Sequence, residues 1–181
     1  MAENKPESRL LPLLTLVNDW LKYAEVKNGV LLTLNGVLLT IIHRLVESLG
    51  EHSEVLDYWL WAVTALLLLS MLVGLASFYA RTKTFGFDIE KPKNSNTHNA
   101  LYYGNLANMK CSDVLHRLVQ KYDSACPDQY LTDLADQIII NSKIARRKFA
   151  LFNFALLITI AALITPVGAL LYYWGLCDDR L

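Results

Sequence analysis

The fold is decided by residues 58–79, which read YWLWAVTALLLLSMLVGLASFY and contain no Asp, Glu, Lys, Arg or His. At about 1.5 Å per residue, a helix of this length crosses a hydrocarbon core of about 30 Å. Residues 149–174, FALFNFALLITIAALITPVGALLYYW, form a second run without these charges. Because a chain of 181 residues lacks the mass to bury two such helices on all sides, we interpret both as membrane spans rather than as core helices.

A third apolar segment, residues 29–46, is shorter and reads GVLLTLNGVLLTIIHRLV. Its uncharged part, residues 29–42, has 14 residues, a length that also suits a helix lying in the membrane surface. If the segment spans the membrane, His43 and Arg44 must reach the far interface. We expect it to cross, and an interfacial helix is the alternative.

Basic residues are unevenly distributed, and their distribution predicts the topology. Residues 80–148 carry 11 Lys and Arg against 7 Asp and Glu, whereas residues 43–57 carry one against four. Segments rich in Lys and Arg stay on the cytoplasmic side of a membrane. We therefore expect residues 81–148 and the N-terminus in the cytoplasm, with the C-terminus outside.

The sequence thus predicts an all-α membrane protein with three transmembrane helices. The first and third of these should extend into the cytoplasm, because no Gly or Pro break separates them from the helical patterns that precede them. The expected segments are a cytoplasmic amphipathic helix at 1–28, transmembrane helices at 29–46, 58–80 and 149–174, a short external loop at 47–57, a cytoplasmic helical segment at 81–148 and an external tail at 175–181.

One face of the first helix carries polar and small residues, which we call the polar stripe. Its members recur at steps of three or four, so they share one side of the helix. Small residues allow helices to approach closely in a membrane, so the stripe is interpreted either as a packing seam or as the wall of an oligomeric pore. The members are Asn18, Lys22, Glu25, Gly29, Thr33, Gly36, Thr40, His43 and Glu47.

Two further groups of polar residues lie within the predicted spans. The second span carries Ser70, Gly74 and Ser77 at helical spacing, which predicts a small-residue packing seam. Asn35 and Asn153 are single amides, and we expect each to bond to a neighbouring helix.

Motifs for catalysis or metal binding are not found in the sequence. It contains no GxSxG, HExxH or Walker A pattern, and its three cysteines form no CxxC pair. We therefore predict neither enzymatic activity nor a metal site. The basic residues Lys143, Arg146, Arg147 and Lys148 are interpreted as contacts for anionic lipid, or alternatively for a phosphate ligand.

Three stretches resemble the membrane effectors of Pycsar antiphage systems, in which a pyrimidine cyclase signals to a small transmembrane protein. They are AEVKNGVLLTLNG at 24–36, NALYYGNL at 99–106 and DQIIINSKIARRKF at 136–149. Glu25 stands where the family usually has Asp. The resemblance covers nearly the whole chain, with the stretches in the family's order.

The resemblance implies an activating ligand, cyclic CMP or cyclic UMP, made by a partner cyclase. Binding on the cytoplasmic side would disrupt the bacterial inner membrane and cause cell death and abortive infection. Segment 81–148 then acts as the sensor. The residues implied in ligand binding are Lys27, Asn99, Tyr103, Asn105, Ser142 and Lys148.

The expected partners are the lipid bilayer, further copies of the chain in a homo-oligomer, and the cyclic nucleotide. No cofactor and no nucleic acid is expected. The rival hypothesis is a non-catalytic membrane scaffold or small subunit that docks a partner through its cytoplasmic helices. A third hypothesis, a membrane enzyme acting on lipid, lacks a catalytic constellation to support it.

Overall fold

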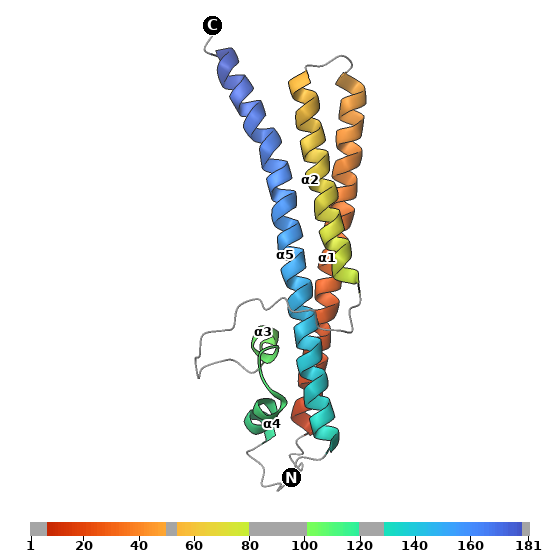
Figure 1. Ribbon diagram of the computed structural model, residues 1–181, viewed down its shortest axis with the longest axis vertical. Helices are drawn as coiled ribbons and strands as arrows, with labels where there is room; N and C mark the ends of the chain where they lie inside the picture. The colour runs from red at the N-terminus through yellow and green to blue at the C-terminus, as the bar shows by residue number, and fades with distance from the viewer. Residues whose placement is uncertain (1–6, 50–53, 80–100, 120–128, 179–181) are drawn as a thin grey trace. The chain divides into compact units, whose positions relative to one another are not determined.

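The computed structural model describes residues 7–49, 54–79, 101–119 and 129–178. Within these ranges it contains five α-helices and no strand (Figure 1). The helices are α1 (Glu7–Leu49), α2 (Glu54–Phe78), α3 (Tyr103–Leu106), α4 (Cys111–Val119) and α5 (Gln129–Asp178). By length and composition, α1, α2 and α5 are each able to cross a membrane. The predicted all-α fold with three long apolar helices is confirmed.

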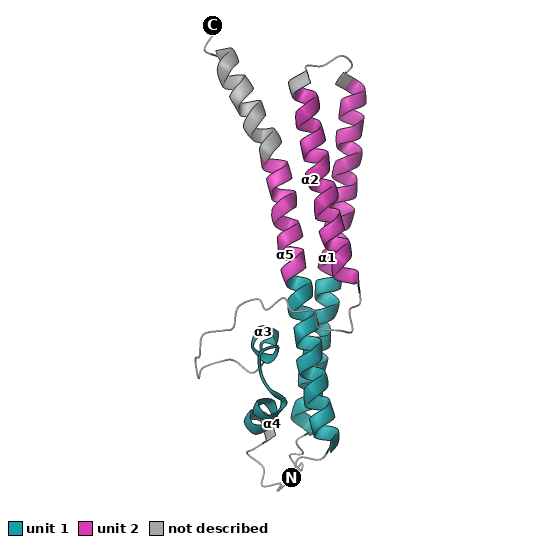
Figure 2. Ribbon diagram, in the orientation of Figure 1, with its two compact units in different colours: residues 1–25, 80–149 teal, residues 26–79, 150–181 magenta. Residues whose placement is uncertain are grey.

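The chain divides into two compact units, which Figure 2 shows in separate colours. Unit 1 contains residues 1–25 and 80–149, and unit 2 contains residues 26–79 and 150–181. Both α1 and α5 contribute to each unit, because each continues from its more polar first part into its apolar second part. The first and third long helices therefore extend beyond their apolar segments, as the sequence predicts.

Unit 1 is built around aliphatic side chains from four helices. Apolar residues on α1 and α5 recur at steps of three or four, so each helix turns one apolar face to the core. The short helices α3 and α4 add residues that cover this face. The core residues are Leu10, Leu13 and Val17 of α1, Leu106 of α3, Val114 and Leu115 of α4, and Leu131, Leu134, Ala135, Ile138 and Ile139 of α5.

Unit 2 contains a buried polar network that joins all three of its helices. Asn35 of α1 donates from Nδ2 to Ser70 Oγ of α2 at 2.9 Å. Thr159 of α5 donates from Oγ1 to Asn35 Oδ1 at 3.0 Å, and Ser70 donates to the Ala155 carbonyl at 2.8 Å. The side chains of Asn35, Ser70 and Thr159 are at most 1% exposed. In hydrocarbon, such groups require partners within the protein, and here each helix supplies one.

A second polar contact joins α1 to α2. Asn28 Nδ2 donates to Ser77 Oγ at 2.8 Å. From Asn35 to Asn28 the chain goes back seven residues, and from Ser70 to Ser77 it goes forward seven, so α1 and α2 run antiparallel. Between these contacts, a Cβ added to Gly74 would lie 3.3 Å from Leu32 Cδ2. The predicted seam of Ser70, Gly74 and Ser77 is thus the face of α2 that packs on α1.

Candidate ligand-binding cluster

Five aromatic rings meet in unit 1, and we call them the aromatic cluster. Tyr103 is at its centre, with ring centroids 5.1 Å from Phe149, 5.5 Å from Trp20 and 4.7 Å from Tyr102. Tyr23 completes the cluster at 6.3 Å from Phe149. These distances lie within the range of favourable aromatic pairs. The rings come from α1, from the start of α3 and from α5, three parts of the chain that are far apart in sequence.

The local sequence explains how α3 presents its tyrosines. Tyr102 precedes the helix with an extended backbone, and its carbonyl accepts the backbone N–H groups of Asn105 and Leu106. A Cβ on Gly104 would lie 2.6 Å from Tyr102 Cε1. The glycine therefore leaves room for the Tyr102 ring to lie against α3. Leu106, on the same short helix, is fully buried and anchors it to the core.

Two cations of α5 are held beside the cluster by polar partners. Arg146 Nη1 donates to Asn108 Oδ1 at 2.7 Å, and Asn108 Nδ2 donates to the Gly104 carbonyl at 3.0 Å. Lys148 Nζ lies 2.6 Å from Glu25 Oε1 of α1. Arg146 is therefore connected to α3, while Lys148 is connected to α1.

The phenol of Tyr103 remains protonated far into the alkaline range. Burial is the main cause that raises its pKa, and a hydrogen bond and charge interaction with Tyr102 add to it. The positive charge of Arg146 acts in the opposite direction and only partly offsets the rise in pKa. Tyr103 thus presents a neutral ring and a hydroxyl group at physiological pH.

Chemically, the cluster combines aromatic faces with cations. Tyr23 is 50% exposed and Tyr102 is 47% exposed, so two rings at its edge are open to a ligand. Planar heterocycles stack on such rings, and Arg and Lys bind anionic groups. The arrangement is therefore suited to a small ligand with a flat ring and a negative charge.

The residues implied in ligand binding do not all lie in this cluster. Tyr103 is at its centre, Asn105 lies half-buried on α3, and Lys148 precedes Phe149 on α5. Ser142 is fully buried in the same unit, and its hydroxyl donates to the Ile138 carbonyl at 2.7 Å. Lys27 belongs to unit 2, where its ammonium lies 5.4 Å from the centroid of the Phe152 ring. Asn99 lies outside the described residues.

The polar stripe has different surroundings in the two units. In unit 1, Asn18 accepts a hydrogen bond of 2.8 Å from Asn141 Nδ2, and Glu25 pairs with Lys148. Lys22 is exposed and pairs with Asp19 on its own helix at 3.7 Å. This part of the stripe therefore includes residues that join α1 to α5.

From Gly29 to Thr40, in unit 2, the stripe lies away from α2 and α5. A Cβ added to Gly29 or Gly36 would meet no atom within 4 Å. Thr33 and Thr40 are exposed, and each donates its hydroxyl hydrogen bond to the carbonyl four residues earlier. The buried face of this part of α1 carries Asn28, Leu31 and Asn35 instead. If this part of the stripe is a packing seam, its partner must be a second chain, because no helix in the described part of the same chain packs against Gly29 or Gly36.

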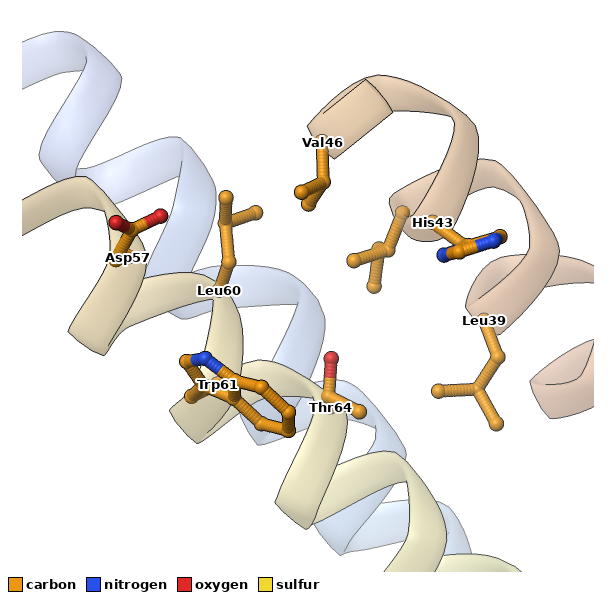
Figure 3. Close-up of a pocket in the computed structure, with 8 residues that line it drawn as sticks. Leu39, His43, Val46, Asp57, Leu60, Trp61 and Thr64 are labelled. Carbon is orange, nitrogen blue, oxygen red and sulfur yellow. The ribbon is translucent and has the colours of Figure 1, made fainter. Parts of the chain in front are cut away.

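His43 and Glu47, the remaining stripe residues, form an exposed pair at 3.3 Å. His43 also lines a cavity of about 200 Å³, and Figure 3 shows side chains of α1 and α2 on its two sides. The lining is mostly apolar. Its polar groups are the side chains of His43, Asp57 and Thr64 and the indole N–H of Trp61. Among the described residues, no three His, Cys, Asp or Glu side chains gather in a way that could hold a metal ion.

Several cluster residues are absent from the ligand-site candidates that the sequence provides. These are Trp20, Tyr23 and Tyr102, whereas Arg146 belongs to the basic group that the sequence already offers as an alternative phosphate contact. The contacts between α1 and α5 in this unit do have a regular spacing. From the pair Asn18–Asn141 to the pair Glu25–Lys148, the chain advances seven residues on both helices. Such matched spacing is what two parallel helices with a common seam produce.

Together, the fold and the cluster define a small all-helical membrane protein with a separate helical unit that carries aromatic and basic groups. A family model described as the Pycsar effector protein domain matches residues 9–175. The chain therefore belongs to the Pycsar effector protein family.

Two relatives support this assignment. The Pycsar effector protein RsPycTM of a Rhizobium species is 33% identical over 146 residues, which cover 78% of this chain and 81% of the relative. The Pycsar effector protein PtPycTM of Propioniciclava tarda is 26% identical over 155 residues, covering 84% of this chain and 72% of the relative. No solved structure matches the chain.

Proposed function

We propose that this protein is the membrane effector of a bacterial antiphage Pycsar system. It responds to cyclic CMP or cyclic UMP, made by a partner cyclase, by disrupting the inner membrane, and the resulting cell death ends the infection. The proposal draws on membership of the effector family and on three helices with the length and composition of membrane spans. It assigns the protein no catalytic step.

The observation that carries the ligand part of this proposal is the convergence of three segments on Tyr103. Its ring contacts Trp20 of α1 and Phe149 of α5, and Lys148 and Arg146 lie on the same part of α5. A pyrimidine would stack on the exposed rings while its cyclic phosphate meets a cation. Ligand bound there would contact α1 and α5, the two helices that continue into unit 2.

The membrane part of the proposal assigns a role to the polar stripe. We propose that several copies of the chain assemble with the Gly29–Thr40 part of α1 facing other copies, and that this face lines the passage when the oligomer opens. The support is that Gly29 and Gly36 have space beside them and that Thr33 and Thr40 are exposed. In this arrangement unit 1 and the N-terminus face the cytoplasm, in keeping with the basic residues of segment 80–148.

Dye release from liposomes tests the proposed function. Purified full-length protein is placed in phosphatidylethanolamine and phosphatidylglycerol vesicles loaded with a self-quenching dye. We expect release on addition of cyclic CMP or cyclic UMP, and none with cyclic AMP or in vesicles without protein. If neither pyrimidine nucleotide causes release, the effector proposal is wrong. The rival hypothesis, a non-catalytic membrane scaffold, is then favoured.

A pair of alanine variants tests whether the aromatic cluster takes the ligand. Tyr23→Ala removes an exposed ring on which the pyrimidine is proposed to stack, so it should raise the nucleotide concentration for half-maximal release roughly tenfold or more. Tyr130→Ala is the matched control, because Tyr130 lies on α5 and is 48% exposed. Equal responses of the two variants would remove the cluster from the proposal.

A further inference from the structure

The ion pair between Glu25 and Lys148 is unequal in its exposure to solvent. Lys148 Nζ lies 2.6 Å from Glu25 Oε1, and the side chains are 14% and 46% exposed respectively. The ammonium is therefore held in a largely buried position, whereas the carboxylate has direct access to water. If the pair separates, Glu25 is the partner that is able to move into solvent at little cost, because a charge left in a buried position loses its hydration.

The position of the pair connects it with the aromatic cluster. Lys148 directly precedes Phe149, whose ring contacts Tyr103, Trp20 and Tyr23. Glu25 follows Tyr23 by two residues on α1. Tyr23 and Glu25 thus lie within one turn of α1, and Lys148 and Phe149 are adjacent on α5, so the ion pair and this edge of the cluster occupy the same stretch of the two helices.

A cyclic nucleotide carries one negative charge on its phosphodiester, and this charge would compete with the Glu25 carboxylate for Lys148. Both anions are oxygen acceptors for an ammonium group, which is a compact charge with three donors. We propose that the Glu25–Lys148 pair is a latch which the ligand opens: the phosphodiester replaces Glu25 on Lys148, and α1 loses this link to α5. This inference rests on the proposed function and adds the step by which binding acts on the helices.

Loss of the Glu25–Lys148 contact would weaken the packing of α1 against α5 at this position along the two helices. The polar contact from Asn141 to Asn18 lies seven residues earlier on each helix. Glu25 is the last residue of α1 assigned to unit 1, and the same helix continues to Leu49. Glu25 therefore lies just before the apolar segment of α1, so a change in helix packing at Glu25 acts on the beginning of that segment. A ligand shifts such an equilibrium by its different affinity for the two arrangements.

The test uses the opposite roles of the two residues in liposome dye release. Glu25→Gln removes the competing charge, so the nucleotide concentration for half-maximal release should fall about 5- to 10-fold and nucleotide-independent leakage should rise. Lys148→Gln also breaks the pair but removes the ligand's cation, so the half-maximal concentration should rise about 10-fold or more. An ion pair that only joins two helices predicts shifts in the same direction for both variants.

Two further variants serve as controls. Asp19→Asn breaks the exposed Asp19–Lys22 pair, which lies within α1 and joins no second helix, and it should respond like the wild type. The double variant Glu25→Lys with Lys148→Glu restores an ion pair with the charges exchanged. It should show wild-type leakage without nucleotide and lose the nucleotide response, because α5 then presents a carboxylate to the phosphodiester.

The three failures of this test are distinguishable. If the wild type responds to nucleotide while both single variants shift in the same direction, the latch is wrong and the proposed function stands. If the double variant responds like the wild type, the latch is likewise overturned. If the wild type responds to neither cyclic CMP nor cyclic UMP, the proposed function is wrong and the latch is overturned with it.

Discussion

The two halves of α1 differ in which residues they bury. In unit 1 the buried face carries Leu10, Val17 and Ala24, and charged residues such as Lys22 lie on the exposed face. In unit 2 the distribution is different: the buried face carries Asn28 and Asn35 beside Leu31, and Val30, Val37 and Ile41 are 52–64% exposed. The first half therefore has the pattern of a helix in water, and the second has that of a helix in lipid.

This comparison indicates that different forces stabilise the packing inside unit 1 and the packing inside unit 2. Burial of apolar surface from water favours the core of unit 1. Lipid chains are as apolar as the side chains of unit 2, so its helices associate through close packing and hydrogen bonds instead. Substitutions of the same kind in the two units should therefore have different consequences.

The largest effect is expected from shortening a side chain in the core of unit 1. Ile138 is fully buried, and Ile138→Ala should lower the free energy of unfolding by about 2–5 kcal/mol through lost burial and a residual cavity. Ile140→Ala, at a 50% exposed position of the same helix, should change it by less than about 1 kcal/mol. Chemical unfolding in detergent micelles, followed by circular dichroism, measures both.

The corresponding substitution in unit 2 shortens a buried leucine of α2. Leu67 is also fully buried, and Leu67→Ala should cost less than Ile138→Ala because water exclusion contributes little inside a membrane. The same unfolding measurement compares the two variants. Equal losses at the two positions would show that packing alone determines both cores.

Two glycines in unit 2 should differ in what a larger side chain does. Gly74→Leu places atoms against Leu32 and should lower the free energy of unfolding by about 1–3 kcal/mol. Gly36→Leu meets open space within the chain, so the free energy of unfolding should change by less than about 0.5 kcal/mol. If the stripe faces other copies, Gly36→Leu should nevertheless abolish toxicity in cells that also make the cyclase.

Thr40→Leu serves as a second probe of the same face, with the same expected loss of toxicity. Membrane insertion of each variant is checked by fractionation. Undiminished toxicity in properly inserted Gly36→Leu and Thr40→Leu proteins would contradict a functional role for the stripe.

A smaller effect is expected from the polar network of unit 2. Asn35→Ala removes the bonds to Ser70 and Thr159 and should lower the free energy of unfolding by about 1–2 kcal/mol, since intramembrane hydrogen bonds contribute roughly 0.6 kcal/mol on average. Asn153→Ala is the control, because Asn153 is exposed on α5. A larger loss at Asn153 than at Asn35 would contradict this account of the network.

The sequence predicts the fold well because each long helix is determined by local properties. The uncharged runs at 58–79 and 149–174 require nothing beyond length and hydropathy to be recognised. The continuity of α1 and α5 follows from the absence of a helix-breaking signal at the junction.

The contacts between helices are less predictable, because periodicity defines faces and does not say what each face meets. Two faces of α1 in unit 2 have steps of three and four: Gly29, Thr33 and Gly36 on one, and Asn28, Leu31 and Asn35 on the other. Either face has the pattern of a packing seam, and the structure uses the second within the chain.

The candidate site shows the same limit. Tyr103 and Lys148 follow from the family resemblance, whereas the partner of Lys148 cannot be identified from the sequence. Glu25 belongs to the polar stripe by its spacing, yet in the structure it pairs across to α5. A pairing between residues 123 positions apart leaves no local pattern.

The smallest expected effect concerns the titration of Tyr103, and it separates the aromatic cluster from exposed tyrosines. Burial and Tyr102 raise its pKa above the ordinary value of 10.0. Below pH 10 the phenol is protonated in the folded and the unfolded chain, so its contribution to stability is fully present. As the pH rises above this value, the unfolded chain releases the proton while the folded chain retains it, so the free energy of unfolding falls.

Tyr103→Phe should remove the contribution of Tyr103 to the fall in the free energy of unfolding at alkaline pH. Between about pH 9 and about pH 11, the unfolding midpoint should therefore decrease less steeply with pH in the variant than in the wild type. The control Tyr130→Phe changes a 48% exposed residue and should leave the slope unchanged. Ultraviolet absorbance of tyrosinate in the folded proteins provides an independent measurement. If Tyr103→Phe removes a tyrosine that ionises near the ordinary pKa of 10.0, the ring is exposed to solvent and the cluster is not formed in the protein. If it leaves the tyrosinate absorbance between about pH 10 and about pH 11 unchanged, Tyr103 is held neutral by the buried environment that α1, α3 and α5 build around it.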